Sequence, residues 1–344
     1  RSPIQDHLRP HLIQAIAMVN LLLEKWYEPP EIEALHLSTL VQQLLSLIAQ
    51  YGGITTAEAW QVLCKTGPFS KVDQSMFISL LRELGAQKLI VQSSENLLLL
   101  DIQGERIVNH YSFFAAFSTP EEYRLIAEGK QLGTLPIAYP LVEGMYLIFA
   151  GRRWQIVAVD NKKKVIHLIA SKGGRPPKFI GGGGFINDKI RDEMQKIYES
   201  TDVPPYLDPT ASDLLVEARK YYHEFKLSKS WIYQSGNDSL LFLWKGDQIQ
   251  NTISLMLKSK GLSVMRDGLS ITVNNCTPNE LVKQLRSVAL HDTLDGKELA
   301  SQVSNKVIEK YDEYLGEDLL SVDYSSRYLN VTRAIDILRQ KLQL

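Results

Sequence analysis

This chain has few cysteines and no long apolar run. These two features limit the kinds of protein and site that the sequence can form. The two cysteines, Cys64 and Cys276, lie far apart in sequence, so they suggest neither a disulfide framework nor a zinc site. No apolar stretch approaches the ~18–20 residues of a membrane-spanning helix, and the first residues do not read as a secretory signal. We expect a cytoplasmic protein with no bound metal and no membrane partner.

Motifs for phosphate transfer are also missing. The pattern Gly-x-x-x-x-Gly-Lys-Ser/Thr does not occur, and the Gly-Lys pairs at 129–130 and 296–297 lack a following hydroxyl. The acidic pairs at 192–193 and 312–313 are expected on solvated helix faces, and the four glycines at 181–184 are expected to form a turn or loop. Without these motifs we expect no ATP hydrolysis and no cofactor in this chain, and we can name no catalytic residue.

Charge is balanced overall but unevenly distributed. The chain has 344 residues, enough for two or three domains, and a net charge of −1. Residues 151–180 contain eight Lys or Arg and one acid, whereas residues 291–323 contain nine acids and three bases. This asymmetry indicates a local basic site rather than general attraction to polyanions.

The order of the expected elements predicts an α+β protein. Helices at 38–50, 55–67 and 73–84 precede short strands at 89–92 and 97–101, which is the winged-helix order. The expected domains are a linker helix (1–34), a winged helix (35–110), a β-barrel-containing, DNA-engaging domain (111–228) and a C-terminal α+β domain (229–344).

Short, regularly spaced strands predict a small β-barrel or curled sheet in the third segment. A strand over 111–117 and a short helix from Pro120 are expected to lead into it. The remaining elements of this segment are strands at 145–150, 153–159 and 164–170 and helices at 186–199 and 209–227.

The fourth segment repeats a strand–strand–helix pattern over residues 230–289, which predicts a ββα-repeat layer. Closing helices are expected at 296–314 and 328–342.

The third helix of the expected winged helix is acidic. Residues 73–84 carry one base and two acids, so we favour a scaffold role for this domain over direct DNA contact.

The basic segment provides the candidate nucleic-acid contacts. Arg152 and Arg153 alternate across a strand, so at most one faces a given ligand surface. Lysines in the following turn serve either phosphate binding or simple solubility. The candidate phosphate-binding residues are Arg152, Arg153, Lys162, Lys163, Lys164, Lys172, Arg175 and Lys178.

Two aromatic side chains in this segment are candidates for stacking on a base. Trp154 is either a barrel core residue or a stacking ring, and Phe179 either stacks on a base or packs against the barrel.

Several stretches together resemble Lhr-type (large helicase-related) DEAD/H-box helicases, in the region that follows their second RecA-like domain. The resemblance covers about residues 1–225. Its motifs lie at 1–30, 36–43, 110–117, 119–125, 132–136, 151–154 and 173–177.

This resemblance implies the C-terminal part of a superfamily 2 translocase that moves on single-stranded or tailed duplex DNA, in DNA repair or defence. ATP and Mg²⁺ are expected only in RecA-like domains of the same polypeptide, to which residues 1–34 are the linker. Phe179 stands where the family has a base-stacking tryptophan. Ile107 is the nearest counterpart of an apolar residue that the family places against DNA.

Two other functions remain open. One is a protein–protein assembly module, a homo-oligomer or a partner complex, docking through residues 291–323 or 230–289. The other is a DNA glycosylase-like domain.

Overall fold

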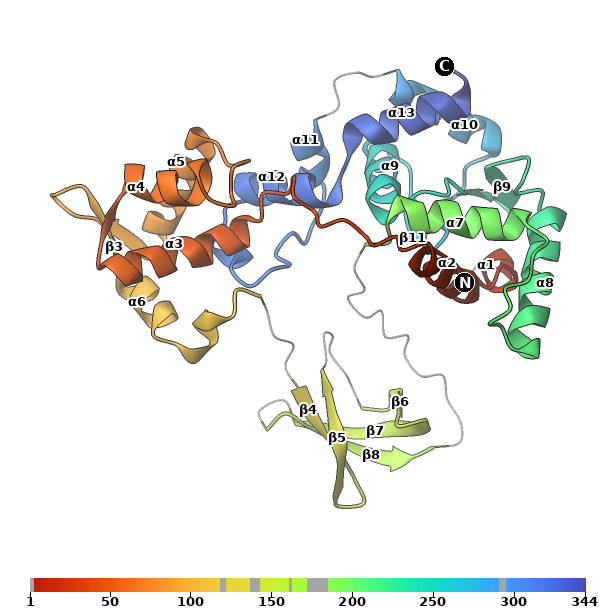
Figure 1. Ribbon diagram of the computed structural model, residues 1–344, viewed down its shortest axis with the longest axis horizontal. Helices are drawn as coiled ribbons and strands as arrows, with labels where there is room; N and C mark the ends of the chain where they lie inside the picture. The colour runs from red at the N-terminus through yellow and green to blue at the C-terminus, as the bar shows by residue number, and fades with distance from the viewer. Residues whose placement is uncertain (1–2, 118–121, 137–142, 161–162, 172–184, 291–294) are drawn as a thin grey trace. The chain divides into compact units, whose positions relative to one another are not determined.

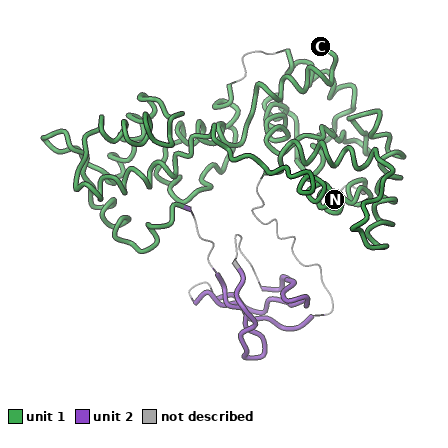
Figure 2. The backbone as a smooth tube through the Cα atoms, in the orientation of Figure 1, with its two compact units in different colours: residues 1–116, 185–344 green, residues 117–184 purple. Residues whose placement is uncertain are grey.

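The structure is a computed structural model that describes residues 3–117, 122–136, 143–160, 163–171, 185–290 and 295–344 (Figure 1). The chain mixes helices and strands, in agreement with the α+β class. It divides into a large unit, residues 1–116 with 185–344, and a small unit, residues 117–184 (Figure 2). The expected domain over 111–228 is therefore shared between two units. No helix in the described ranges has the length and apolar character needed to cross a membrane.

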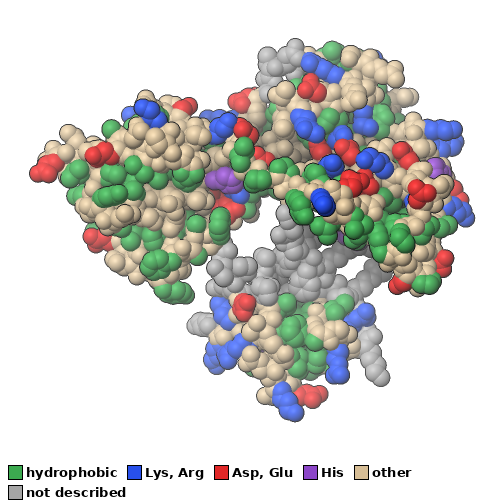
Figure 3. Space-filling view, viewed as in Figure 1, with side chains coloured by type: hydrophobic (Ala, Val, Ile, Leu, Met, Phe, Trp, Pro, Cys, Tyr) green, Lys and Arg blue, Asp and Glu red, His purple; other side chains and the backbone are tan. Residues whose placement is uncertain are grey.

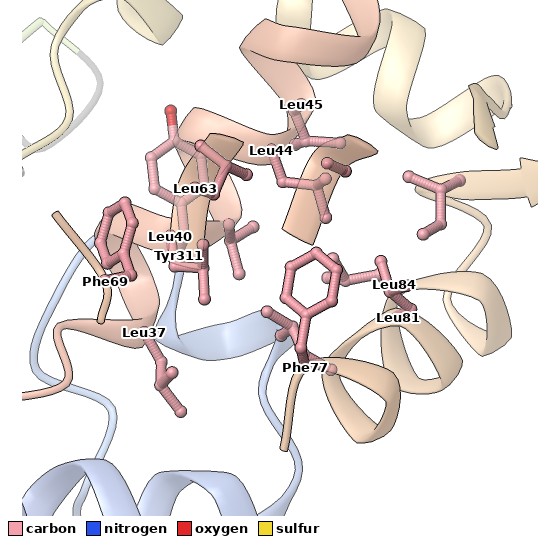
Figure 4. Close-up of a cluster of buried hydrophobic side chains, with 14 of the residues drawn as sticks. Leu37, Leu40, Leu44, Leu45, Leu63, Phe69, Phe77, Leu81, Leu84 and Tyr311 are labelled. Carbon is pink, nitrogen blue, oxygen red and sulfur yellow. The ribbon is translucent and has the colours of Figure 1, made fainter. Parts of the chain in front are cut away.

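The first core of the large unit forms around α3 (Leu37–Tyr51), in which Leu37, Leu40, Leu44 and Leu45 are fully buried (Figure 4). A capping box between Thr55 and Glu58 starts the next helix, and the Asp73 side chain caps α5. Three strands pair antiparallel in the order β1-β3-β2. The other elements are β1 (Ile54–Thr55), α4 (Thr56–Trp60), the π-helix η1 (Gln61–Lys65), α5 (Gln74–Ala86), β2 (Ile90–Gln92), β3 (Leu97–Leu100) and α6 (Ile102–Val108).

Residues near the end of the sequence complete this first core. Tyr311 and Leu319 are buried in it. The expected helix over 296–314 is wrong, because α11 ends at Ser301 and only a 3-10 turn forms later. The Asp312 side chain accepts hydrogen bonds from two backbone N–H groups upstream, which ends any regular helix there. The elements are α11 (Gly296–Ser301), η3 (Asp312–Tyr314) and α12 (Glu317–Tyr328).

A second core holds the N-terminal helices, α1 (Pro3–His7) and α2 (Pro10–Leu23), against α7 (Asp188–Glu199) and α8 (Pro209–Glu224). The expected linker helix is broken at Arg9, which adopts a left-handed conformation at the start of α2. The hydroxyl of Tyr198 donates to the Leu8 carbonyl at 2.6 Å. Residues 1–34 are therefore integrated into the large unit.

The third core lies under a four-stranded sheet of order β11-β12-β10-β9. Its strands and helices follow the order strand–strand–helix twice, and the helices α11 and α13 pack on them. The elements are β9 (Ile232–Ser235), β10 (Asp238–Leu241), α9 (Asp247–Ser259), β11 (Val264–Asp267), β12 (Ser270–Val273), α10 (Pro278–Ala289) and α13 (Val331–Leu342).

The small unit is a curled five-stranded sheet of order β5-β4-β8-β7-β6. β4 and β8 pair in parallel, and the other neighbours are antiparallel. The two edge strands approach each other, because a Cβ added to Gly133 in β5 would lie 2.7 Å from the Phe149 ring in β6. The strands are β4 (Glu122–Ala127), β5 (Lys130–Pro136), β6 (Tyr146–Phe149), β7 (Arg152–Asp160) and β8 (Val165–Ala170).

Two expectations near the start of this sheet are wrong. Residues 111–117 do not form a strand, because Tyr111–Phe114 make a 3-10 helix, η2, capped by the His110 side chain. The chain enters a strand rather than a helix at Glu122, where β4 begins and pairs on both sides.

Candidate nucleic-acid interface

The curled sheet of the small unit has an apolar inner face. Strand alternation places every second side chain of β4, β7 and β8 on this face. These side chains pack into one cluster and close the concave side of the sheet. Its buried members are Leu125, Ala127, Leu147, Trp154, Ile156, Ile166 and Leu168.

The outer face of the sheet carries alternating cationic, polar and aliphatic side chains. On β7, Arg153 lies opposite Ile148 of β6, and Gln155 lies opposite Ile169 of β8. The Arg153 side chain is exposed, and Ile148 and Ile169 are 53% and 48% exposed. An exposed cation thus lies beside large exposed apolar side chains.

The same face continues across β8 and β4. His167 is exposed and lies opposite Ile126. One step along, Arg124 is exposed opposite Val165. A bulge in β7 beside these residues presents Val157, which is 46% exposed. We call Arg124, Ile126, Ile148, Arg153, Gln155, Val157, His167 and Ile169 the outer face.

The candidate cations divide between the two ends of β7. Arg152 and Arg153 begin this nine-residue strand, and Lys163 and Lys164 follow its end. At ~3.3 Å per residue the strand separates them by roughly 26 Å. The sequence cluster is therefore not one compact patch, and its described cations lie at opposite ends of the sheet.

The lysine turn has local contacts of its own. The ammonium of Lys163 lies 3.9 Å from the Asp160 carboxylate, and the Lys164 ammonium lies 5.2 Å from the Tyr123 ring centroid. The backbone carbonyl of Lys164 accepts a hydrogen bond from the Arg124 N–H at 2.8 Å. Arg124 therefore joins the turn lysines at this end of the sheet. Figure 3 shows cationic side chains along the margins of the small unit and apolar side chains between them.

Trp154 is a core residue and does not stack on a base. Its side chain is 8% exposed, and its indole N–H donates to the Phe149 carbonyl at 3.2 Å. Strand alternation puts Trp154 on the inner face, between exposed Arg153 and half-buried Gln155. Of the two interpretations of this tryptophan, the structure supports the barrel core.

Several candidates lie outside the described residues. These are Lys162, Lys172, Arg175, Lys178 and Phe179.

Ile107 belongs to the large unit. It lies on α6, half-buried, and packs against the first core. It also lines a cavity between α6, η2 and residues 310–314. Its burial gives it a packing role in addition to any contact with a ligand.

His167 is a candidate that the sequence analysis missed. It is an exposed aromatic ring on the outer face, and histidine rings are among those on which unstacked bases lie. The available signal was its position between Ile166 and Leu168, where alternation predicts one exposed side chain between two buried ones.

The described residues offer little for covalent or metal chemistry. Burial raises the pKa of the Cys64 thiol to about 11, and burial also raises the pKa of Cys276. Both cysteines are therefore protonated and weakly nucleophilic near neutral pH. No group of three or more His, Cys, Asp or Glu side chains in the described ranges is placed to hold a metal ion.

Comparisons with protein-family models, curated proteins and solved structures found no match to this chain.

Proposed function

We propose that this chain binds single-stranded DNA as the C-terminal portion of an Lhr-like ATP-dependent helicase. The strand lies across the outer face of the small unit. ATP and Mg²⁺ would bind to RecA-like domains of the same polypeptide, and the partner would be single-stranded or tailed duplex DNA. The family assignment rests on the sequence resemblance, whereas the binding surface rests on the side chains of the sheet.

The outer face is the observation that carries the proposal. It presents Arg153 near one end and Arg124 near the other, with His167 and exposed aliphatic side chains between them. The phosphates of single-stranded DNA bind cations spaced along its path, and its bases stack on aromatic rings and lie against apolar surface. The span of roughly 26 Å along β7 suits a site of about four nucleotides or more, the lower range for small β-barrels.

The helical region over 37–108 is proposed to be a winged helix that acts as a scaffold. Its order of helices and the antiparallel β2–β3 pair support this interpretation. Its third helix, α5, buries Phe77 and Leu80 and uses the Glu83 carboxylate to accept the Gly316 N–H at 2.6 Å. Packing thus occupies side chains on more than one side of α5.

Titration of fluorescently labelled oligo(dT) against the chain at two salt concentrations tests the proposal. In the double variant Arg124→Gln/Arg153→Gln we expect weaker binding and a smaller salt dependence. Each lost phosphate contact lowers the slope of log K against log salt by about 0.7 for a single strand, so the expected change is about 1.4. His167→Ala should weaken binding with little change in this slope.

The matched control removes two exposed cations from the large unit, in the variant Lys229→Gln/Lys258→Gln. This control should keep the affinity and slope of the unchanged chain. Equal losses in both double variants would show diffuse attraction, and no loss in Arg124→Gln/Arg153→Gln would remove the outer face as the site.

Self-association through the same face is a second candidate function. Ile148, Val157 and Ile169 are each about half exposed, and grouped apolar side chains often mark protein interfaces. Light scattering over a range of concentrations tests this. A dimer that Ile148→Ser/Ile169→Ser abolishes would support assembly, and a monomer throughout would exclude it.

A further inference from the structure

A cavity of about 370 Å³ lies in the large unit, between α6, η2 and residues 310–314. Arg106, Ile107 and His110 line one side, and Lys310 and Tyr311 line another. The volume lies at the lower end of the range for small-molecule sites. The site is separate from the outer face, so its argument does not depend on the function proposed above.

Lys310 gives this cavity an unneutralised positive charge. Its ammonium donates to the carbonyls of Ser112 and Ala115, the latter at 2.7 Å, and lies 5.1 Å from the Tyr311 ring centroid. An ammonium has three N–H donors, so one remains after these two bonds. Within the described ranges no carboxylate lies within 4 Å of it, and burial lowers the pKa of Lys310.

Arg106 adds a second cation to the cavity wall. It is exposed at the last turn of α6 and likewise has no carboxylate within 4 Å among the described residues. Glu313 is the single acid in the lining. Arginine and lysine therefore outnumber acids, and the lining favours an anion.

Aromatic side chains form the rest of the site. Phe113 meets Tyr311 edge-on, with ring centroids 6.4 Å apart. Tyr111 and Phe114 are 83% and 88% exposed, and the Tyr111 ring lies 4.4 Å from the His110 ring. Residues three apart on a 3-10 helix share one side, so Tyr111 and Phe114 share the side of η2 that does not line the cavity, and His110, Phe113, Tyr311 and Tyr314 supply its rings.

The Tyr311 hydroxyl is a buried donor without an acceptor. Tyr311 is 2% exposed, and within the described part of the chain its hydroxyl has no hydrogen-bond partner. Burial raises the pKa of Tyr311 to about 12, so the hydroxyl keeps its proton and can donate. Figure 4 shows Tyr311 beside the buried leucine side chains of the first core.

We propose that this cavity binds a nucleoside 5′-phosphate, with the phosphate at Lys310 and Arg106 and the base against the ring of His110. Two cations suit a phosphate, the exposed His110 ring suits a planar base, and the Tyr311 hydroxyl supplies a further donor. A free mononucleotide and the phosphorylated end of a single strand share this chemistry.

Calorimetric titration of the full chain tests the site. AMP should bind with a dissociation constant below about 1 mM, whereas adenosine should bind at least tenfold more weakly. Arg106→Gln and Tyr311→Phe should each weaken AMP binding by about tenfold. Because Lys310 also holds η2 in place, its replacement is not used.

Tyr311→Phe separates a ligand role from a structural one. The variant removes only an unpartnered hydroxyl, so its urea midpoint should equal or exceed that of the unchanged chain while AMP binding falls. Lys229→Gln, an exposed cation of the same unit, is the matched control and should bind AMP normally.

Two further ligands identify the source of the phosphate. Binding of 5′-phosphorylated but not 5′-hydroxyl oligo(dT), in competition with AMP, would assign the site to a strand end. AMP binding without such competition would assign it to a free nucleotide. The proposal would be overturned if AMP at ten times the expected dissociation constant gave no heat of binding. It would also be overturned if AMP bound equally well to Arg106→Gln, Tyr311→Phe and the unchanged chain.

Discussion

Replacing Asp323 with alanine is predicted to loosen the junction between α3 and α12. One oxygen of this carboxylate accepts the Leu37 N–H at 2.8 Å, and the other lies 3.5 Å from the Arg327 guanidinium. Asp323 is 3% exposed and Leu37 is fully buried. Asp323→Ala leaves the Leu37 N–H without an acceptor, while Arg327 keeps Glu309 at 2.7 Å. We expect a loss of about 2 kcal/mol in the free energy of unfolding.

Asp323→Asn is the matched control. Its amide oxygen can still accept the Leu37 N–H, so only the longer contact with Arg327 and the buried charge are lost. We expect this variant to lose less than about 1 kcal/mol, because removing a buried charge offsets part of the lost ion pair. The difference between the two variants therefore isolates the hydrogen bond at the start of α3.

Urea unfolding gives the free energies, and hydrogen exchange gives the location. Exchange in peptides from the first turns of α3 should accelerate in Asp323→Ala and change little in Asp323→Asn. Equal free energies for the two variants, or unchanged exchange at the start of α3 in the alanine variant, would refute this account of the junction.

Two further changes test the sheet and the buried acids. Gly133→Ala places a Cβ 2.7 Å from the Phe149 ring, so we expect it to destabilise the sheet locally by about 1–3 kcal/mol. Hydrogen exchange in β5 and β6 should then be faster. Adding Phe149→Leu should relieve the effect. Burial raises the pKa of both Asp312 and Asp323, so the native state binds their protons more tightly than the unfolded chain. From the unfolded carboxyl pKa of about 3.9 upward, their contribution to stability should fall as pH rises through the raised native values. Urea midpoints across pH 4–7 should show a smaller fall in Asp312→Asn than in the unchanged chain; an identical pH dependence would contradict the assignment.

Local signals predicted many elements of the fold. The helices expected from residues 55 and 73 begin there in the structure, with a Thr55–Glu58 capping box and an Asp73 cap. The alternation of β7 predicted a strand, and the structure contains it with a bulge. Such signals depend on neighbours within a few residues, which a sequence shows directly.

Other elements depend on distant contacts. Residues 111–117 are rich in aromatics and read as a strand, but the His110 cap and the Lys310 ammonium hold them in a 3-10 turn. The expected helix over 296–314 fails because Tyr311 is buried among residues of the first core and the Asp312 side chain accepts the backbone N–H groups of Ile308 and Glu309. Spacing along the chain could not assign the contact of Lys310 with residues 111–117 or the burial of Tyr311 in the first core.

The candidate site was predicted in part. Arg153 and the lysine turn were found from charge, and the described residues among them are placed on the sheet. Their closeness in sequence suggested one patch, yet an extended strand carries them apart. Which face of β7 is buried depends on the other strands of the sheet, so Trp154 could be assigned to the core only from the folded structure.

The first core is assembled from residues 35–113 and residues 311–320. During synthesis at about 5–20 residues per second, the last of these side chains emerge roughly 10–40 s after the early helices. Until then the nascent chain keeps Leu37 and its neighbours partly uncovered and open to chaperones. A chain that stops before residue 311 should therefore lose packing around α3 as well as the residues it lacks.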